Sequence, residues 1–172
     1  MDQNYFDPPE YIYYDVSVAP QQSLESALIS ASPIHPGAKI AYGMTTWNVR
    51  WEARWSTDKS QKSCSIWAAN AYIKSEIQLP HLRNGSDAQK KQFDNYVEGL
   101  RAHQLVHYGF GLSAAKEIEK EVNAMPAMAD CGVLEMAVNA LAKKIINDYR
   151  TRGQAYDLSN EFLNSQHALL EY

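Results

Sequence analysis

The chain has 172 residues, of which 45% are hydrophobic and 11% aromatic, and its formal net charge at pH 7 is −4. This length suits one domain with a sizeable apolar core, so we expect residues 1–172 to form a single domain. The mildly acidic balance gives no sign of the basic patch that nucleic-acid-binding domains usually carry. No run of about eighteen apolar residues exists, so we expect no membrane span.

The first half of the chain, about residues 10–80, predicts strands with one short helix among them. Residues 11–18 are rich in aromatic and β-branched side chains, which is typical of a strand. Residues 23–29 then favour a short helix, for which Ser23 is a suitable N-cap.

A stronger strand pattern follows at residues 45–55. Tryptophans and other apolar residues occupy one parity of this segment, while polar and charged residues occupy the other. Residues 57–60 favour a turn, after which residues 64–73 and 77–80 return as strand. Together these segments predict an N-terminal antiparallel sheet of three to four strands.

The second half, about residues 86–172, has a helical period. From about residue 88 to residue 122 the apolar side chains recur at spacings of three and four. Gly109 and Gly111 weaken this helix by about 1 kcal/mol each relative to Ala, which indicates a kink or a close approach. A sheet followed by helices predicts the α+β class.

Two further helices are predicted in this half. One runs from about residue 131 to residue 149, and Arg152-Gly153 is its expected end. The segment 160–170 favours a short last helix.

The spacing of His103 and His107 is the clearest chemical signal in the chain. Residues four positions apart share one face of a helix, with Cβ atoms roughly 5–6 Å apart, so both rings reach one divalent cation. The pair is the zinc-binding half of the H-E-x-x-H motif, but Gln104 stands where that motif has its catalytic Glu. The competing interpretation is that both are hydrogen-bonded histidines of the apolar stripe.

A zinc site needs a third protein ligand, and a catalytic site also keeps one position for water. The third His of the extended protease motif is absent, because position 113 is Ser. The other candidates are His167, Asp157 and Glu161 in the tail, and Glu117, Glu121 and Asp130 nearer the pair. The tail is the better source, since a helix that ends at Arg152 lets the chain return to the histidines.

The two cysteines, Cys64 and Cys131, do not form a C-x-x-C pair, so a cysteine zinc site is not expected. Two interpretations stay open. The thiols form a disulfide in an oxidising compartment, or they are two unrelated buried side chains.

Several short segments in a fixed order carry a resemblance to a known family. They are Tyr14-Asp15-Val16, residues 46–51 (TWNVRW), Cys64, residues 77–80 (IQLP), Tyr96 and Leu100 ahead of the histidine pair, Cys131, and Tyr156-Asp157. This ordered set resembles a bacterial domain family described as secreted zinc-dependent proteases and otherwise of unknown function. The resemblance implies strands followed by helices, a zinc cofactor and a peptide or protein substrate.

The same resemblance bears on the cysteines and on the compartment. It implies a disulfide between Cys64 and Cys131, because both fall where the family places them. It also implies a periplasmic or secreted protein. The start of the chain lacks the basic and apolar regions of a signal peptide, so from the residues alone either the protein is cytosolic or the sequence begins after a removed leader. The export that the resemblance implies requires the second alternative.

Two departures from the family pattern concern the site. Gln104 replaces the family's Glu, and only Tyr156-Asp157 match a tail pattern that continues with Thr and then His-Gly. His167 is the nearest later histidine and is the expected third ligand, with Asp157 as the alternative.

Gln cannot accept a proton near neutral pH, and loss of general acid–base help typically slows a reaction by about 10²–10⁴-fold. The sequence therefore predicts a zincin-like metallopeptidase scaffold that is inactive or impaired as written. Gln104 is then natural, in a pseudoenzyme or a vestigial site, or it is an engineered replacement of Glu. The alternative is a non-catalytic exported module that binds a peptide or protein, with the tryptophans at 47, 51, 55 and 67 lining a groove.

Overall fold

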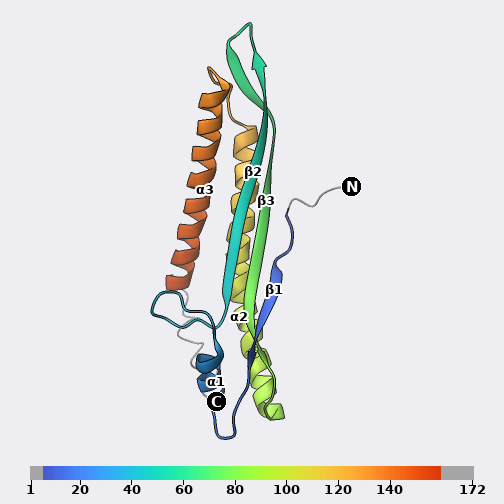
Figure 1. Ribbon diagram of the computed structural model, residues 1–172, viewed down its shortest axis with the longest axis vertical. Helices are drawn as coiled ribbons and strands as arrows, with labels where there is room; N and C mark the ends of the chain where they lie inside the picture. Colours follow the sequence, from blue (N-terminus) through green and yellow to red (C-terminus); the bar gives the residue numbers. More distant parts are fainter. Residues whose placement is uncertain (1–5, 160–172) are drawn as a thin grey trace. The chain divides into compact units, whose positions relative to one another are not determined.

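The computed structural model describes residues 6–159, which form three strands and three helices (Figure 1). In chain order these are β1 (Glu10–Val16), α1 (Leu24–Ala31), β2 (Met44–Asp58), β3 (Ser63–Leu82), α2 (Asp87–Asn123) and α3 (Cys131–Ser159). The predicted α+β class is confirmed. No helix in this described part of the chain is both long enough and apolar enough to cross a membrane.

The sheet has three strands in the order β1-β3-β2, and β1 runs parallel to β3 with Glu10 opposite Glu76 and Val16 opposite Leu82. The strand count agrees with the prediction, but the expectation of an antiparallel sheet is wrong for β1, so the sheet is mixed. Alternation of apolar and polar residues identifies the buried face of a strand and carries no information on its direction. The chain between β1 and β3 is long enough for either direction.

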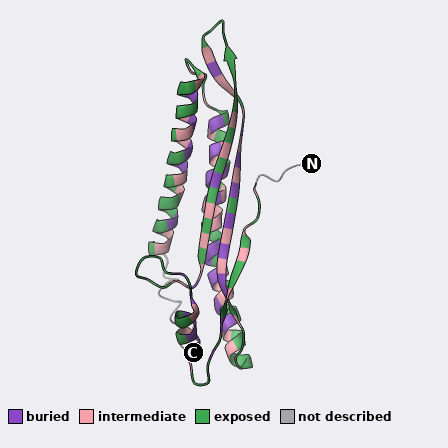
Figure 2. Cartoon of the chain, viewed as in Figure 1, coloured by how far each residue is buried: buried purple, intermediate pink, exposed green. Residues whose placement is uncertain are grey.

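The β2–β3 connection is a short turn at residues 59–62. The Asp58 carboxylate accepts hydrogen bonds from the backbone N–H groups of Ser60 and Gln61, at 2.9 and 3.1 Å. Lys62 has φ 51°, in the left-handed region that a tight reversal requires. The predicted parity of β2 is confirmed for residues 45–53, where Val49 is buried, the other odd-numbered positions are half-buried and the even-numbered positions are exposed. It fails at Trp55, which is 37% exposed. Figure 2 shows the alternation as bands along β2.

The described chain divides into two compact units. The first unit contains the described residues of Met1–Pro8, together with Trp47–Ser75 and Gly109–Gln154. The second contains Pro9–Thr46, Glu76–Tyr108 and the described residues of Ala155–Tyr172. The single-domain expectation for residues 1–172 stays a prediction.

The second unit has an apolar core built from β1, α1, β3 and α2. Its buried members are Val16, Val18, Leu24, Ala27, Leu28, Tyr42, Ile77, Leu79, Phe93, Tyr96 and Leu100. Ser23 caps α1 as predicted, because its hydroxyl accepts from the backbone N–H of Ser26 at 3.1 Å. A reciprocal pair of bonds between Ser86 and Gln89 caps the start of α2.

In the first unit, side chains of α2 satisfy the backbone of β3. Asn123 donates to the carbonyl of Ala69 at 2.8 Å and accepts from its N–H at 2.9 Å. Of the two effects predicted for the glycines of α2, a kink or a close approach, Gly111 shows the close approach. A Cβ added there would lie 2.6 Å from the Trp47 ring. Gly111 therefore marks a close approach of helix and strand.

Helix α3 continues about ten residues beyond its predicted end, to Ser159. The expected stop at Arg152-Gly153 is wrong, because a single glycine costs a helix only about 1 kcal/mol and tertiary packing overrides that cost. Gly153 is buried inside the helix. The extra turns carry Tyr156 and Asp157, whereas the last helix predicted at 160–170 lies outside the described residues.

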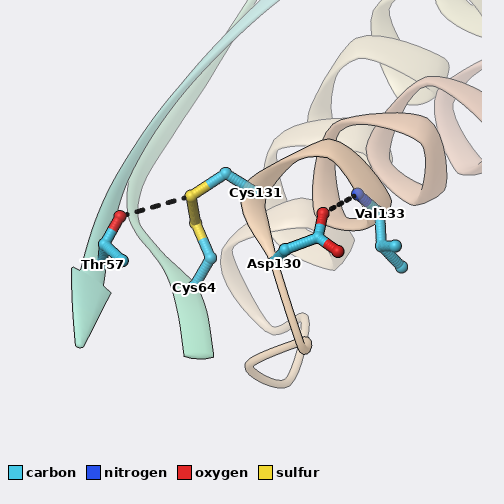
Figure 3. Close-up of a disulfide and its surroundings, with 5 residues drawn as sticks. All are labelled: Thr57, Cys64, Asp130, Cys131 and Val133. Carbon is cyan, nitrogen blue, oxygen red and sulfur yellow. Dashed lines mark hydrogen bonds between the residues drawn. A yellow bond between two sulfur atoms is a disulfide. The ribbon is translucent and has the colours of Figure 1, made fainter. Parts of the chain in front are cut away.

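Cys64 and Cys131 form a disulfide across 67 positions of sequence, with Cα atoms 5.1 Å apart (Figure 3). Of the two interpretations left open by the residues, the disulfide is the one observed. Two backbone hydrogen bonds between Cys64 and Met128, at 2.8 and 2.9 Å, support it. The Asp130 carboxylate caps the start of α3 by accepting from the N–H of Val133 at 2.8 Å.

Candidate metal centre

Helix α2 presents His103 and His107 on the same face, as their spacing predicts. The ring centroids are 5.0 Å apart, with an interplanar angle of 65°. The two Nε2 atoms lie 3.3 Å apart, so both rings point toward one place. Convergence of the two nitrogens is what binding of one shared ion requires, and the metal site itself stays a prediction.

Asp157 of α3 completes the group. Its Oδ1 lies 3.0 Å from Nε2 of His103 and 2.7 Å from Nε2 of His107. The three ligand atoms, one from each residue, all lie within 4.8 Å of one another. All three residues belong to the second unit.

The other third-ligand candidates are not brought to the pair within the described chain. Glu117 accepts from the hydroxyl of Tyr149 at 2.8 Å, Glu121 pairs with Lys120 at 2.9 Å, and Asp130 caps α3. His167, the first choice from sequence, and Glu161 lie outside the described residues. Asp157, the alternative, is the residue that the structure places at the histidines.

The donor set fits a divalent cation. Tetrahedral zinc with bonds of about 2.0–2.1 Å places neighbouring ligand atoms roughly 3.3 Å apart. The separation of the two imidazole nitrogens, 3.3 Å, equals this value. The nitrogen–oxygen distances of 3.0 and 2.7 Å are hydrogen-bond lengths, so a small outward shift of the carboxylate would admit the ion.

Burial favours the protonation state that a metal ligand requires. The side chain of His103 is only 5% exposed, and that of His107 is 16% exposed. Desolvation lowers the pKa of His103, the neighbouring His107 lowers it further, and the Asp157 carboxylate acts in the opposite direction. His103 is therefore held toward its neutral form, whose ring nitrogen carries the lone pair that binds a metal.

Tyr156 packs on both histidine rings. Its ring stacks on His103 with centroids 4.9 Å apart and planes 26° apart, and meets the edge of His107 at 5.6 Å and 76°. In the sequence, Tyr156 stands out only as part of the family pattern, which gives it no role. Its position directly before Asp157 on a helix was the available signal, once that helix was known to continue.

Gln104 is 5% exposed and is held by Thr45 of β2. The Thr45 hydroxyl lies 2.9 Å from both the side-chain Oε1 and the backbone oxygen of Gln104. The amide is thus fixed beside the histidines, at the place of the general base in the protease motif. Thr45 could not be identified from sequence as a site residue, because a strand pattern does not show which helix residue a polar side chain contacts.

A cavity of about 420 Å³ opens onto these residues, within the range usual for small-ligand sites. Its lining consists of Ile34, Pro36, Lys39, Ile40, Ala41, Tyr42, Gly43, Met44, Thr45, Leu100, His103, Gln104, His107, Asp157 and Leu158. A larger cavity of about 580 Å³ in the second unit contains none of the predicted site residues. His81 lines that larger cavity, and its Nδ1 lies 3.6 Å from Oδ1 of Asp15.

The predicted tryptophan groove has no support in these cavities. No tryptophan lines either of the two cavities described above. Trp47 packs against Gly111, and Trp51 donates to the side chain of Asn139 at 3.1 Å. Trp67, which is 62% exposed, contacts the guanidinium of Arg54.

Comparison with known proteins assigns a family and no activity. Residues 11–164 match a family described as bacterial protein of unknown function, DUF922. No curated protein and no solved structure matches the chain. The match covers most of the sequence, including the histidine pair, Asp157 and both cysteines, and the chain therefore belongs to the DUF922 family of bacterial proteins.

Proposed function

We propose that the chain binds a divalent metal, zinc in the first instance, through His103, His107 and Asp157. The observation that carries this proposal is the convergence of three ligand atoms from two helices within 4.8 Å. Two neutral imidazoles and one carboxylate are a donor set that zinc accepts. Three protein ligands leave a fourth position, which is the composition of a catalytic site and not of a closed structural one.

We further propose that the site derives from a zincin-like metallopeptidase. The histidine spacing on α2 is that of the protease motif, and Gln104 occupies the position of its general base. A bound zinc ion would supply Lewis-acid polarisation of a carbonyl or of water. At position 104 the chain supplies the neutral amide of Gln104, which accepts a hydrogen bond from Thr45. This amide cannot take up a proton.

The proposed peptidase is therefore impaired in the form given. Loss of a general base costs typically about 10²–10⁴-fold in rate. A glutamate at position 104 would have nearly the same shape and would keep Thr45 as a hydrogen-bond donor. The cavity therefore has room for an active form without rearrangement.

Metal binding is tested first, by isothermal titration with zinc and by elemental analysis of protein purified without chelator. We expect one zinc per chain and loss of at least 100-fold in affinity for His103→Ala and for Asp157→Asn. His35→Ala is the matched control, because His35 is exposed and lies outside the donor group. A chain that binds no divalent ion, or variants that bind as tightly as the original, would refute the metal site.

Peptidase ancestry is tested by Gln104→Glu on an unfolded protein substrate. We expect activity to appear in the zinc-loaded variant and to disappear with Asp157→Asn in the same background. Gln61→Glu adds the same charge in the β2–β3 turn and should gain nothing. If the zinc-loaded Gln104→Glu protein has no activity on several unfolded substrates, the peptidase proposal is refuted and the metal-site proposal is not affected.

We also propose that the protein is exported to an oxidising compartment. The disulfide between Cys64 and Cys131 supports this, because disulfides persist in the periplasm or outside the cell and are rare in the cytosol. Alkylation of free thiols in intact cells, before and after reduction, would show the bond in the native compartment. Two free thiols at both stages would contradict export.

A further inference from the structure

The cavity beside the metal ligands joins an apolar wall to a small charged end. Apolar side chains form most of the lining, among them Ile34, Ile40, Met44, Leu100 and Leu158. Several are unusually exposed for large hydrophobic residues, with Leu158 at 88%, Ile40 at 42% and Met44 at 38%. Exposed apolar side chains gathered around a cavity indicate a surface that a ligand covers.

The charge of this cavity favours an anion when a cation is bound. Among the described lining residues, the side chains with a formal charge at neutral pH are Lys39 and Asp157. Adding a divalent ion and keeping both histidines neutral gives a net charge of about +2 by this arithmetic. A glutamate at position 104 would lower that sum by one unit and would repel an anion at close range.

Neutral Gln104 therefore changes what the site can hold. An ionised general base repels a ligand carboxylate placed next to it. Here the base position carries an uncharged amide in a buried, low-dielectric setting. Gln in place of Glu at position 104 therefore removes proton transfer and also removes the repulsion between the Glu carboxylate and a bound carboxylate.

We propose that this site binds the C-terminal carboxylate of a peptide whose last residue is apolar. This inference rests on the proposed metal site. The carboxylate occupies the charged end beside Gln104, and the last side chain lies against the apolar wall. A carboxylate on an Asp or Glu side chain meets the charge requirement but leaves no apolar group for the wall.

The test uses the zinc-loaded full chain in titration calorimetry with three peptide probes and with acetate as a fourth ligand. The probes are acetyl-Ala-Leu with a free carboxylate, the same dipeptide as its carboxamide, and acetyl-Ala-Glu carboxamide, whose only carboxylate is on the side chain. We expect the free acid to bind at least 10-fold more tightly than either carboxamide. Acetate alone should bind more weakly than acetyl-Ala-Leu by a similar factor, because it lacks the apolar side chain.

Two variants assign the effect to this chain's residues. Gln104→Glu should weaken binding of the free acid by at least 10-fold, and Lys39→Ala should weaken it several-fold. Gln61→Glu and Lys59→Ala make the same charge changes in the β2–β3 turn and should leave binding unchanged. The zinc affinity of each variant is measured alongside, so that a lost metal is not mistaken for a lost peptide.

The outcomes separate this inference from the proposed function. Zinc binding with equal affinity for the free acid and its carboxamide would overturn the inference and leave the metal site intact. Acetate binding as tightly as acetyl-Ala-Leu would also overturn it, since the apolar wall would then contribute nothing. Absence of zinc binding would refute both the proposed metal site and the peptide-binding inference that rests on it.

Discussion

His103 is a buried polar side chain whose ring nitrogens need partners, because an unpaired polar group in a protein interior is costly. Its Nε2 finds the Asp157 carboxylate at 3.0 Å. The Tyr156 ring stacks on one face of the imidazole. The hydrogen bond limits rotation of the imidazole within its plane, and the stacking limits its tilt. Tyr156 is not one of the three proposed ligands, and metal sites depend on such neighbouring residues to orient the rings of their histidine ligands.

Replacing Tyr156 tests this orienting role. We expect Tyr156→Leu to weaken zinc binding by about 10-fold or more, the scale usual for supporting residues of metal sites. Tyr156→Phe keeps the ring contacts with His103 and His107 and should keep most of the affinity. The measurement is competition with a chromophoric chelator, together with the visible spectrum of the cobalt form. Equal affinities for the Leu variant and the original would show that the stacking is only packing.

Tyr14 provides a pH test at the same scale. Its hydroxyl donates to the backbone oxygen of Tyr42 at 2.8 Å. Burial raises the pKa of Tyr14 to about 12, with a smaller contribution in the same direction from Tyr42 and an opposing one from Ser32. In the unfolded chain a tyrosine ionises near pH 10, so between about pH 10 and 12 the unfolded state holds fewer protons than the folded state.

Stability should therefore fall as the pH rises from about 10 to 12, and Tyr14→Phe should make this fall shallower. Urea midpoints measured across that range give the slope. Tyr13→Phe, one position away on β1 and 49% exposed, is the matched control and should leave the slope unchanged. Identical slopes for Tyr14→Phe and the original protein would contradict the assignment.

At the scale of elements, the two glycines of α2 differ in what surrounds them. A Cβ at Gly111 would lie 2.6 Å from the Trp47 ring and 2.9 Å from the Cδ1 of Ile73, whereas a Cβ at Gly109 would meet nothing within 4 Å. Both substitutions to Ala gain the same helix propensity, about 1 kcal/mol. Any difference between them therefore reports the contact between helix and strand.

We expect Gly109→Ala to stabilise the protein by up to about 1 kcal/mol and Gly111→Ala to destabilise it by about 1–3 kcal/mol, the usual cost of overpacking. Urea unfolding followed by circular dichroism measures both. Two variants of equal stability would mean that the helix and β2 lie further apart than these distances state.

Elements with a strong periodic pattern were predicted well, and those decided by tertiary contacts were not. The 3.6-residue period placed α2 within about one residue at each end, and alternation identified β2 and its buried face. The direction of β1 was wrong because strand periodicity is the same for both directions. The end of α3 was wrong because Gly153 is a weak helix breaker and its position is buried by packing that no local pattern reveals.

The same division explains the candidate site. Histidine spacing within one helix is a local signal, so His103 and His107 could be predicted to share a face. Asp157 is 50 positions from His107, and only the unexpected length of α3 brings it there. From sequence, His167 ranked first because the family's tail pattern contains a His and His167 is the nearest later histidine, so Asp157 stood only as the alternative.

For the whole molecule, the disulfide and the metal ligands provide separate reporters. Cys64, Cys131 and all four tryptophans belong to the first unit, while His103, His107 and Asp157 belong to the second. Tryptophan fluorescence therefore follows the first unit, and the absorbance of a cobalt-loaded protein follows the second. If residues 1–172 form one cooperative domain, both signals change at the same urea concentration.

Reduction of the disulfide is the sharpest use of these reporters. Opening a loop of 67 positions should lower the free energy of unfolding by about 4 kcal/mol, because the reduced unfolded chain regains conformational entropy. The double variant Cys64→Ser, Cys131→Ser should show the same loss without reductant, and added reductant should not change it further. In a single domain the fluorescence and cobalt midpoints fall together. A fluorescence midpoint that falls while the cobalt midpoint stays would instead show two units that unfold independently, since the cross-link would then stabilise only the unit that contains it.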